Sequence, residues 1–91
     1  MQTLLSFMSI KPNYDNNWHI ILHEDSSLSA MYVVQVLMSV LKYDYDVADK
    51  IMQEALTNGR AIVITTDYST ALSYRVKLEQ KELTVTLEEV R

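Results

Sequence analysis

The side chains with the greatest potential for chemistry lie together in His23-Glu24-Asp25-Ser26-Ser27. Histidine and carboxylates are the usual ligands of metal sites and the usual groups of general acid–base catalysis. The second histidine, His19, lies four residues upstream on the same face of an expected strand, roughly 13 Å away from His23. That distance is too large for a shared metal, and adjacent loop residues point in different directions. We therefore expect no metal site and no catalytic residues, and we interpret the stretch as a solvated loop or a polar binding site.

Composition excludes several other functions. The chain has no cysteine, which removes thiol catalysis, disulfides and cysteine-type zinc sites, and its one glycine, Gly59, cannot form a phosphate-binding loop. The net charge of −4 argues against a nucleic-acid partner and leaves room for a cationic one. The longest apolar run, Met31 to Leu41, is too short to span a bilayer. We expect a soluble intracellular protein without cofactor, and not an enzyme.

The apolar patterns predict the elements on both sides of the acidic loop. Alternation from Trp18 to His23 predicts a strand, with Trp18, Ile20 and Leu22 on one face and His19, Ile21 and His23 on the other. A helix from Ala30 to about Lys42 follows, with Ser29 as its N-cap. Only three positions of this helix are polar, on one line, so most of its circumference should be buried. Those positions are Gln35, Ser39 and Lys42.

The second half of the chain predicts four further elements. Asp44 caps a second helix with an apolar stripe formed by Val47, Ala48, Ile51, Met52, Ala55 and Leu56, and Gly59 ends it in the left-handed C′ position. A β-branched strand over 60–66, which we expect to be buried, a helix capped by Asp67 and a strand over 83–90 complete the order β-α-α-β-α-β. In that last strand, Leu83, Val85 and Leu87 alternate with polar residues.

This order predicts a single α+β domain, with a small three-stranded antiparallel sheet and three helices packed on one face. The 91 residues are enough for one modest core. We place the domain at residues 18–91 and treat residues 1–17 as an N-terminal extension and linker. Its first ten residues are interpreted as a tail or an added edge strand, or as a segment that a partner grips.

Several short motifs, in this order and spacing, resemble the ClpS adaptor family, over about residues 18 to 89. They are Trp18-His-Ile-Ile-Leu before the acidic loop, Tyr32-Val33-Val34-Gln-Val36-Leu37, Tyr43-Asp, Ala48…Ile51-Met52, Gly59-Arg60-Ala61 and Thr86-Leu87-Glu88. The resemblance implies a monomeric adaptor that docks on the N-terminal domain of a Clp-type AAA+ unfoldase. It also implies recognition of substrate proteins by a bulky hydrophobic N-terminal residue, a role for the extension in delivery, and a cytoplasmic location, or the plastid stroma if the protein is organellar.

The resemblance also implies a substrate-binding pocket, which this sequence matches in part. Where the family has Asn-Asp-Asp in the loop, the chain has Glu24, Asp25 and Ser26. Ala30 replaces a pocket methionine, and Ala55 replaces a valine. The remaining expected lining residues are Leu28, Val33, Met52, Leu56 and Leu83.

Leu56 is the most consequential departure, because it takes the place of the family's amine-binding histidine. Glu24 keeps an acceptor and adds charge, which offsets that loss if the geometry allows. Ala30 and Ala55 should widen the pocket. Two interpretations of Leu56 stay open: it is a rim residue of an altered pocket, or it is simply a core residue of the second helix.

The implied docking surface departs from the family as well. A glutamate after the second strand and a lysine on the third helix correspond here to Ser69 and Tyr74, and Asp67 and Arg75 lie close enough to substitute for them. A capping role explains Asp67 equally well. Two functions are therefore open: an adaptor for hydrophobic N-terminal residues, or a regulator or competitor of the Clp unfoldase without amine recognition. An unrelated protein–protein module on the same frame is a third alternative.

Overall fold

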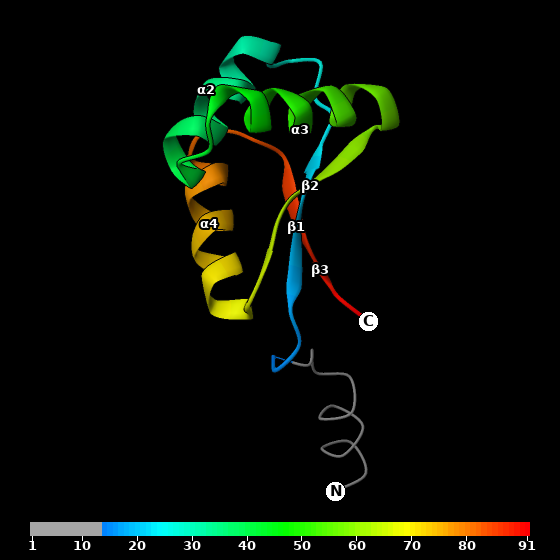
Figure 1. The fold of residues 1–91 in the computed structure, drawn as a ribbon, viewed down its shortest axis with the longest axis vertical. Helices are drawn as coiled ribbons and strands as arrows, with labels where there is room; N and C mark the ends of the chain where they lie inside the picture. The colour runs from blue at the N-terminus through cyan, green and yellow to red at the C-terminus, as the bar shows by residue number, and fades with distance from the viewer. Residues whose placement is uncertain (1–13) are drawn as a thin grey trace, which may run out of the picture.

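A computed structural model describes residues 14–91 and confirms the order β-α-α-β-α-β (Figure 1). The interpretations offered for the first ten residues lie outside this range, and the division of the chain at residue 18 stays a prediction. No helix in the described range has the length and apolar character needed to cross a membrane. The elements are β1 (Trp18–His23), α2 (Ala30–Leu41), α3 (Tyr45–Asn58), β2 (Arg60–Thr66), α4 (Tyr68–Gln80) and β3 (Val85–Glu89).

The three strands form one antiparallel sheet in the order β2-β1-β3, so β1 is the central strand. Trp18, Ile20 and Leu22 face the helices and belong to the core, as the alternation predicts. Ile21 faces the other side of the sheet and is nevertheless only 1% exposed. The register places Arg60 of β2 and Glu88 of β3 diagonally across β1 from each other, and their ion pair of 3.0 Å therefore passes over this side of the central strand.

A β-bulge between β1 and β2 shapes the side of the sheet that packs against the helices. Ile20 pairs with Ile64 and Ile21 pairs with Ile62, so Val63 is the extra residue on β2. Val63 is buried, and its carbonyl oxygen accepts a hydrogen bond of 2.8 Å from the hydroxyl of Tyr43. The bulge therefore adds an apolar side chain to the core without leaving its backbone carbonyl unpaired.

The predicted helix caps are confirmed. Side-chain oxygens of Ser29, Asp44 and Asp67 accept hydrogen bonds from the third backbone N–H that follows each of them, at 3.0–3.1 Å. Gly59 takes a left-handed conformation with φ 85° and donates its N–H to the carbonyl of Ala55. Lys42 is also left-handed, which ends α2 at Leu41, one residue earlier than the pattern predicts.

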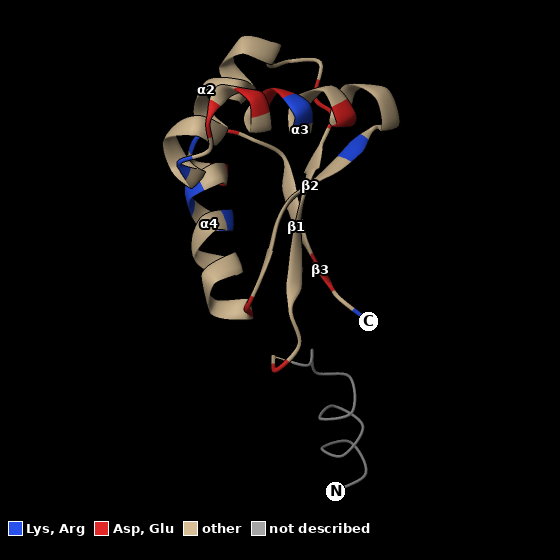
Figure 2. Cartoon of the chain, viewed as in Figure 1, with Lys and Arg blue, Asp and Glu red and all other residues tan. Residues whose placement is uncertain are grey.

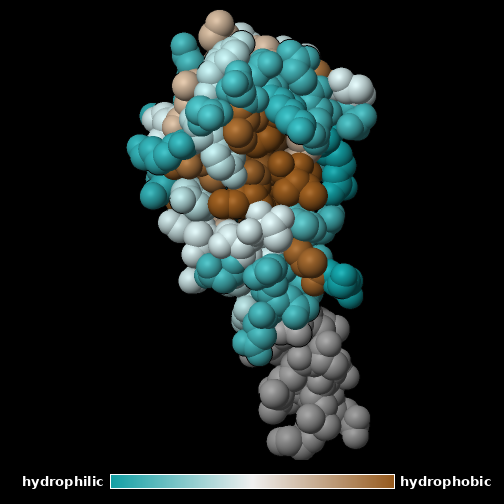
Figure 3. Space-filling view, viewed as in Figure 1, coloured by the Kyte–Doolittle hydropathy of each residue, from teal (hydrophilic) through white to brown (hydrophobic). Residues whose placement is uncertain are grey.

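Predictions of burial are wrong at Met31 and Val47, and also at Ile62 of the strand expected to be buried, which is 48% exposed. Met31 is 62% exposed because the first turn of α2 borders an opening on the surface instead of the core. Val47 and Leu56 are also exposed, since only the middle of the stripe on α3 faces the core. Apolar surface is also visible beside α4 and below α3 (Figure 3).

Candidate functional site

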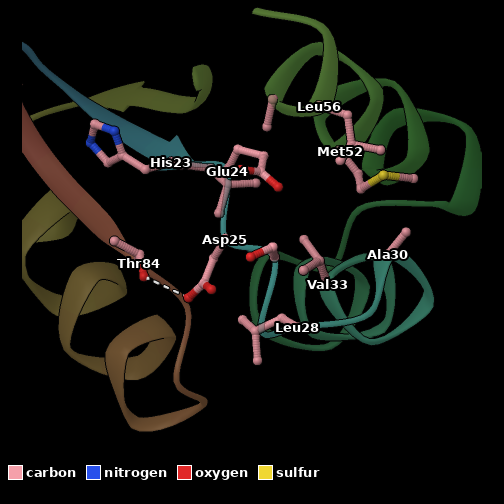
Figure 4. A pocket seen from close by; sticks show the side chains of 12 residues that line it. His23, Glu24, Asp25, Leu28, Ala30, Val33, Met52, Leu56 and Thr84 are labelled. Carbon is pink, nitrogen blue, oxygen red and sulfur yellow. Dashed lines mark hydrogen bonds between the residues drawn. The ribbon is translucent and has the colours of Figure 1, made fainter. Parts of the chain in front are cut away.

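A pocket of about 180 Å³ opens where β1 ends, α2 begins, α3 ends and the chain enters β3 (Figure 4). The first two segments flank a single loop, and the antiparallel pairing of β1 with β2 and β3 brings the other two to the same end of the sheet. The lining residues are Leu22, His23, Glu24, Asp25, Ser26, Leu28, Ala30, Val33, Met52, Ala55, Leu56 and Thr84.

The interior of the pocket is apolar. Leu22 from β1 and Met52 and Ala55 from α3 are buried in the core and present part of their surface to the cavity. Leu28 and Val33 are partly buried and complete the wall on the side of α2. The pocket therefore favours an apolar side chain, which gains free energy when it leaves water.

Asp25 in the acidic loop is held by hydrogen bonds within the protein. One carboxylate oxygen, Oδ1, accepts from the backbone N–H and the hydroxyl of Ser27, at 2.9 and 2.6 Å. The other, Oδ2, accepts from the hydroxyl of Thr84 at 3.2 Å. These bonds, above all the two from Ser27, lower the pKa of Asp25 and keep it charged at neutral pH.

Glu24 differs from Asp25 because its side chain has no such anchor. Its backbone N–H donates to the carbonyl of Gly59 at 3.0 Å, which fixes the main chain. Within residues 14–91, no group donates a hydrogen bond to the Glu24 carboxylate. The side chain is exposed and extends toward the space between Met52 and Val33 (Figure 4).

The electrostatics at the mouth favour a cation. Glu24 and Asp25 bring two negative charges to the rim, and α3 carries further acidic residues along its exposed side (Figure 2). Opposite charge close to a ligand lowers the free energy of its charged form. An apolar interior beside an anionic rim suits a ligand that is apolar at one end and positively charged next to it.

The walls of the pocket are tied to one another by backbone and side-chain bonds. The N–H of His23 donates to the carbonyl of Thr84 at 2.9 Å, and the N–H of Leu28 donates to the carbonyl of Asp25 at 3.2 Å. The hydroxyl of Tyr32 donates to the carbonyl of Lys81 at 2.9 Å, which joins α2 to the turn before β3. Such bonds hold the pocket in one geometry before a ligand arrives, which reduces the entropic cost of binding.

All of the predicted pocket residues except Leu83 line this cavity. Leu83 is 3% exposed and belongs to the core, and the cavity is lined instead by its neighbour Thr84. The sequence-based prediction also missed Leu22 and His23. Leu22 could have been predicted, because it lies one residue before the end of the strand that leads into the acidic loop and faces the helices. That these residues bind a substrate stays a prediction.

Leu56 is a rim residue, and its interpretation as a core residue is wrong. Its side chain is 53% exposed and it lines the pocket one helical turn after Met52. The histidine position of the family is therefore occupied by an apolar side chain that is directly accessible to a ligand.

The residues predicted for docking lie along α4. Asp67 is its N-cap and accepts hydrogen bonds from the backbone of Thr70 and the hydroxyl of Thr66, which lower its pKa. Ser69 is exposed, and Tyr74 packs against the core. Arg75 Nε lies 3.4 Å from a carboxylate oxygen of Glu79 on the same helix. The capping explanation of Asp67 is thus confirmed, while docking stays a prediction.

The two histidines are engaged with threonines on neighbouring strands. His19 Nδ1 lies 2.7 Å from the hydroxyl of Thr65, and His23 Nε2 lies 2.7 Å from the hydroxyl of Thr86. Among the residues that the structure describes, no three His, Cys, Asp or Glu side chains are grouped closely enough to hold a metal ion.

Comparisons with known proteins agree with this architecture. The sequence model of the family described as "ATP-dependent Clp protease adaptor protein ClpS" matches residues 13–86. A curated relative from Arabidopsis thaliana, the chloroplastic ATP-dependent Clp protease adapter protein CLPS1, is 39% identical over 72 residues, which are 78% of this chain and 45% of that protein. The chain therefore spans less than half the length of this relative.

A solved structure, Agrobacterium tumefaciens ClpS2 bound to L-phenylalaninamide, superimposes with a TM-score of 0.76. The match covers 82% of this chain and 98% of that one, at 22% sequence identity, so it establishes the fold. The family model matches most of the chain, and the chain has the fold of a solved ClpS structure. The protein therefore belongs to the ClpS family of Clp protease adaptors.

Proposed function

We propose that this protein is an adaptor that binds substrate proteins by a bulky hydrophobic N-terminal residue and presents them to a Clp-type AAA+ unfoldase. The observation that carries the proposal is the pocket itself, with an apolar interior directly beside the carboxylates of Glu24 and Asp25. A protein N-terminus has the matching chemistry, because its α-ammonium group lies one carbon from the first side chain.

The magnitudes support recognition of a single residue. Burying a Leu or Phe side chain contributes about 1.5–3 kcal/mol, and a hydrogen bond to a charged group contributes about 1.5–3 kcal/mol. The volume of about 180 Å³ exceeds that of a cavity of roughly 150 Å³ that binds benzene in another protein, so an aromatic side chain fits. The ligand of the A. tumefaciens relative, an amide of phenylalanine, has this combination of aromatic ring and free amine.

Peptide titration tests the proposal directly. Peptides that begin with Phe, Leu, Trp or Tyr are titrated by calorimetry, together with the same peptides acetylated at the N-terminus. We expect binding of the free peptides and a loss of at least tenfold on acetylation. A peptide that begins with Ser is the matched control for the apolar pocket. Equal binding of free and acetylated peptides would overturn the proposal.

Membership of the ClpS family supports a Clp-type unfoldase as the partner. We propose that its N-terminal domain docks on the surface formed by Asp67, Ser69, Tyr74 and Arg75, and that the adaptor acts as a monomer in the cytoplasm or the plastid stroma. Substitution of Ser69 by Arg places a large cation on an exposed position at the start of α4. This change should weaken the complex in a pull-down with the unfoldase domain and leave peptide binding unchanged.

A second function is favoured by Leu56. An exposed leucine at the rim contributes no hydrogen bond to an amine, so the protein would act as a regulator or competitor that occupies the unfoldase without N-terminal recognition. The same experiments separate the two. Binding to the unfoldase domain together with failure of every free-amine peptide would support the regulator, and failure of both would remove both proposals.

A further inference from the structure

We propose that Leu56 and Ala30 form a second subsite, which contacts the side chain of the substrate's second residue and favours an apolar side chain there. This inference rests on the proposed function and extends it, because the apolar interior and the acidic loop engage only the first residue. It gives Leu56 a role in substrate selection that does not involve the amine.

The rim of the pocket has a polar half and an apolar half. The exposed lining residues are Glu24, Ser26, Ala30, Leu56 and Thr84. The three polar ones lie on the acidic loop and just before β3, whereas Ala30 begins α2 and Leu56 lies in the last turn of α3. Figure 4 shows Leu56 and Ala30 on the side of the opening away from Thr84. A substrate chain that leaves the pocket therefore meets different chemistry on the two sides.

Leu56 differs in exposure from the other large apolar residues that line the pocket. Its side chain is 53% exposed. The others are buried or partly buried, and they are Leu22, Leu28, Val33 and Met52. A first side chain in the interior contacts these less exposed residues, so the outward part of Leu56 stays in water unless a further group covers it.

The stereochemistry of an amino acid places the second residue over the apolar half. The Cα of the first residue carries the ammonium group, the side chain and the carbonyl carbon, and the N–Cα–C angle is about 111°. With the side chain in the interior and the ammonium group beside the carboxylates of Glu24 and Asp25, the carbonyl carbon is directed away from the acidic loop. The next Cα follows after about 3.8 Å, which puts the second side chain at the rim beside Leu56 and Ala30.

The two residues of this subsite favour an apolar partner. Contact with an apolar side chain would remove part of the exposed surface of Leu56 from water. Ala30 is small and leaves space for that side chain. A polar second residue would gain no hydrogen bond from either side chain, because neither has a polar atom.

Two peptides test the subsite on the intact protein. Both begin with Phe and share one sequence, except that the second residue is Leu in one and Asn in the other, two side chains of similar shape. The readout is the ratio of their affinities, measured by calorimetry. We expect the peptide with Leu to bind about three- to tenfold more tightly, as partial burial of a Leu side chain implies.

Three variants assign the preference to Leu56. Leu56→Asn removes the apolar contact and should bring the ratio close to one, whereas Leu56→Met should keep it. Val47→Asn is the matched control, because Val47 is an exposed apolar residue of the same helix that does not line the pocket. It should leave the ratio unchanged. The difference between wild type and Leu56→Asn measures the coupling between position 56 and the second residue.

Failure of this inference is distinguishable from failure of the proposed function. If the wild-type protein binds neither peptide, both are overturned. If it binds the two peptides equally, only the second subsite is overturned. A preference that persists in Leu56→Asn, or that is lost equally in Val47→Asn, would also overturn the subsite and leave recognition of the first residue intact.

Discussion

Under the proposed function, Leu56 limits the number of hydrogen bonds that the pocket can make to the substrate's amine. It stands at the rim, about half exposed, with Met52 one helical turn below it. An apolar rim residue can contact the substrate but cannot accept from its ammonium group. If the pocket binds an amine as proposed, the hydrogen bonds to it come from the loop alone, and a substitution at position 56 tests whether a further acceptor strengthens binding.

Substitution of Leu56 by His should strengthen binding of a Phe-initiated peptide. A neutral imidazole adds one acceptor for the ammonium, and a hydrogen bond contributes about 0.5–1.5 kcal/mol, which corresponds to about two- to tenfold in affinity. Calorimetry at pH 8, where a histidine of ordinary pKa is neutral, measures the change. Leu56→Ala is the control and should give no gain. An equal gain for the acetylated peptide would contradict this explanation.

At the scale of elements, the junction between α3 and β2 holds one side of the pocket. Gly59 adopts φ 85°, and its carbonyl accepts the N–H of Glu24. A Cβ at this position would meet no atom within 4 Å, so the requirement for glycine is conformational and not steric crowding by neighbours. The left-handed turn thereby links the end of a helix to the aim of the acidic loop.

Gly59→Ala should destabilise the protein by about 1–2 kcal/mol, the cost of a left-handed conformation for a residue with a Cβ. Gly59→Asn should cost less, because Asn tolerates this conformation. Urea denaturation followed by circular dichroism gives both free energies of unfolding. Equal losses for Ala and Asn, or no loss for Ala, would show that the turn is not the source of the requirement.

The N-cap of α4 should make stability depend on pH. Hydrogen bonds from Thr70 lower the pKa of Asp67 in the folded state. Because the folded pKa lies below the unfolded one, the stabilisation is fully present above the unfolded pKa of about 3.9 and is lost as the pH falls through the folded pKa.

The comparison variant is Asp67→Asn, which keeps a capping oxygen and has no proton to gain. We expect the wild type to be more stable than Asp67→Asn at pH 7 and the difference to vanish as the pH falls through the folded pKa of Asp67. Urea denaturation of both proteins at a series of pH values measures this difference. A difference that grows on acidification would contradict the assigned direction of the pKa.

Local chemistry explains which elements were predictable from the sequence. Ser29, Asp44 and Asp67 cap helices through hydrogen bonds to residues three positions away, and Gly59 ends α3 through its own φ. The ends of these helices are therefore determined by the local sequence. The bulge at Val63 and the exposure of Met31 depend on neighbours that are distant along the chain.

The same distinction explains the pocket. The acidic loop and the facing residues of α2 and α3 were predictable because the family resemblance supplies their roles. Thr84 was missed because the sequence does not show that, just before β3, Leu83 is buried in the core while its polar neighbour Thr84 turns toward the acidic loop.

At the scale of the whole molecule, the pocket and the start of α4, where Asp67 and Ser69 lie, are at opposite ends of the sheet (Figure 1). β1 enters at Trp18, near the start of α4, and leaves at His23, beside the pocket (Figure 1). Its six residues span about 17 Å at the usual rise of a strand. Tyr14 also packs here, with its ring centroid 4.4 Å from that of Tyr68, so the N-terminal extension joins the domain at the end away from the pocket.

This separation predicts that substrate and unfoldase bind independently, and Trp18 offers a way to observe it. It is the only tryptophan of the chain, is buried, and lies 5.2 Å from Tyr68 between ring centroids, at the end where Asp67 and Ser69 begin α4. A saturating Phe-initiated peptide, whose binding is followed by calorimetry, should leave the emission of Trp18 unchanged.

The same peptide should leave the affinity for an unfoldase N-terminal domain unchanged within about twofold, since coupling between distant sites requires a differential contact that both ligands share. Docking of a tryptophan-free unfoldase domain at the start of α4 should shift the Trp18 emission in the presence or absence of peptide. A peptide that shifts the emission, or that competes with the unfoldase domain, would place the two sites in contact and contradict the arrangement proposed for this adaptor.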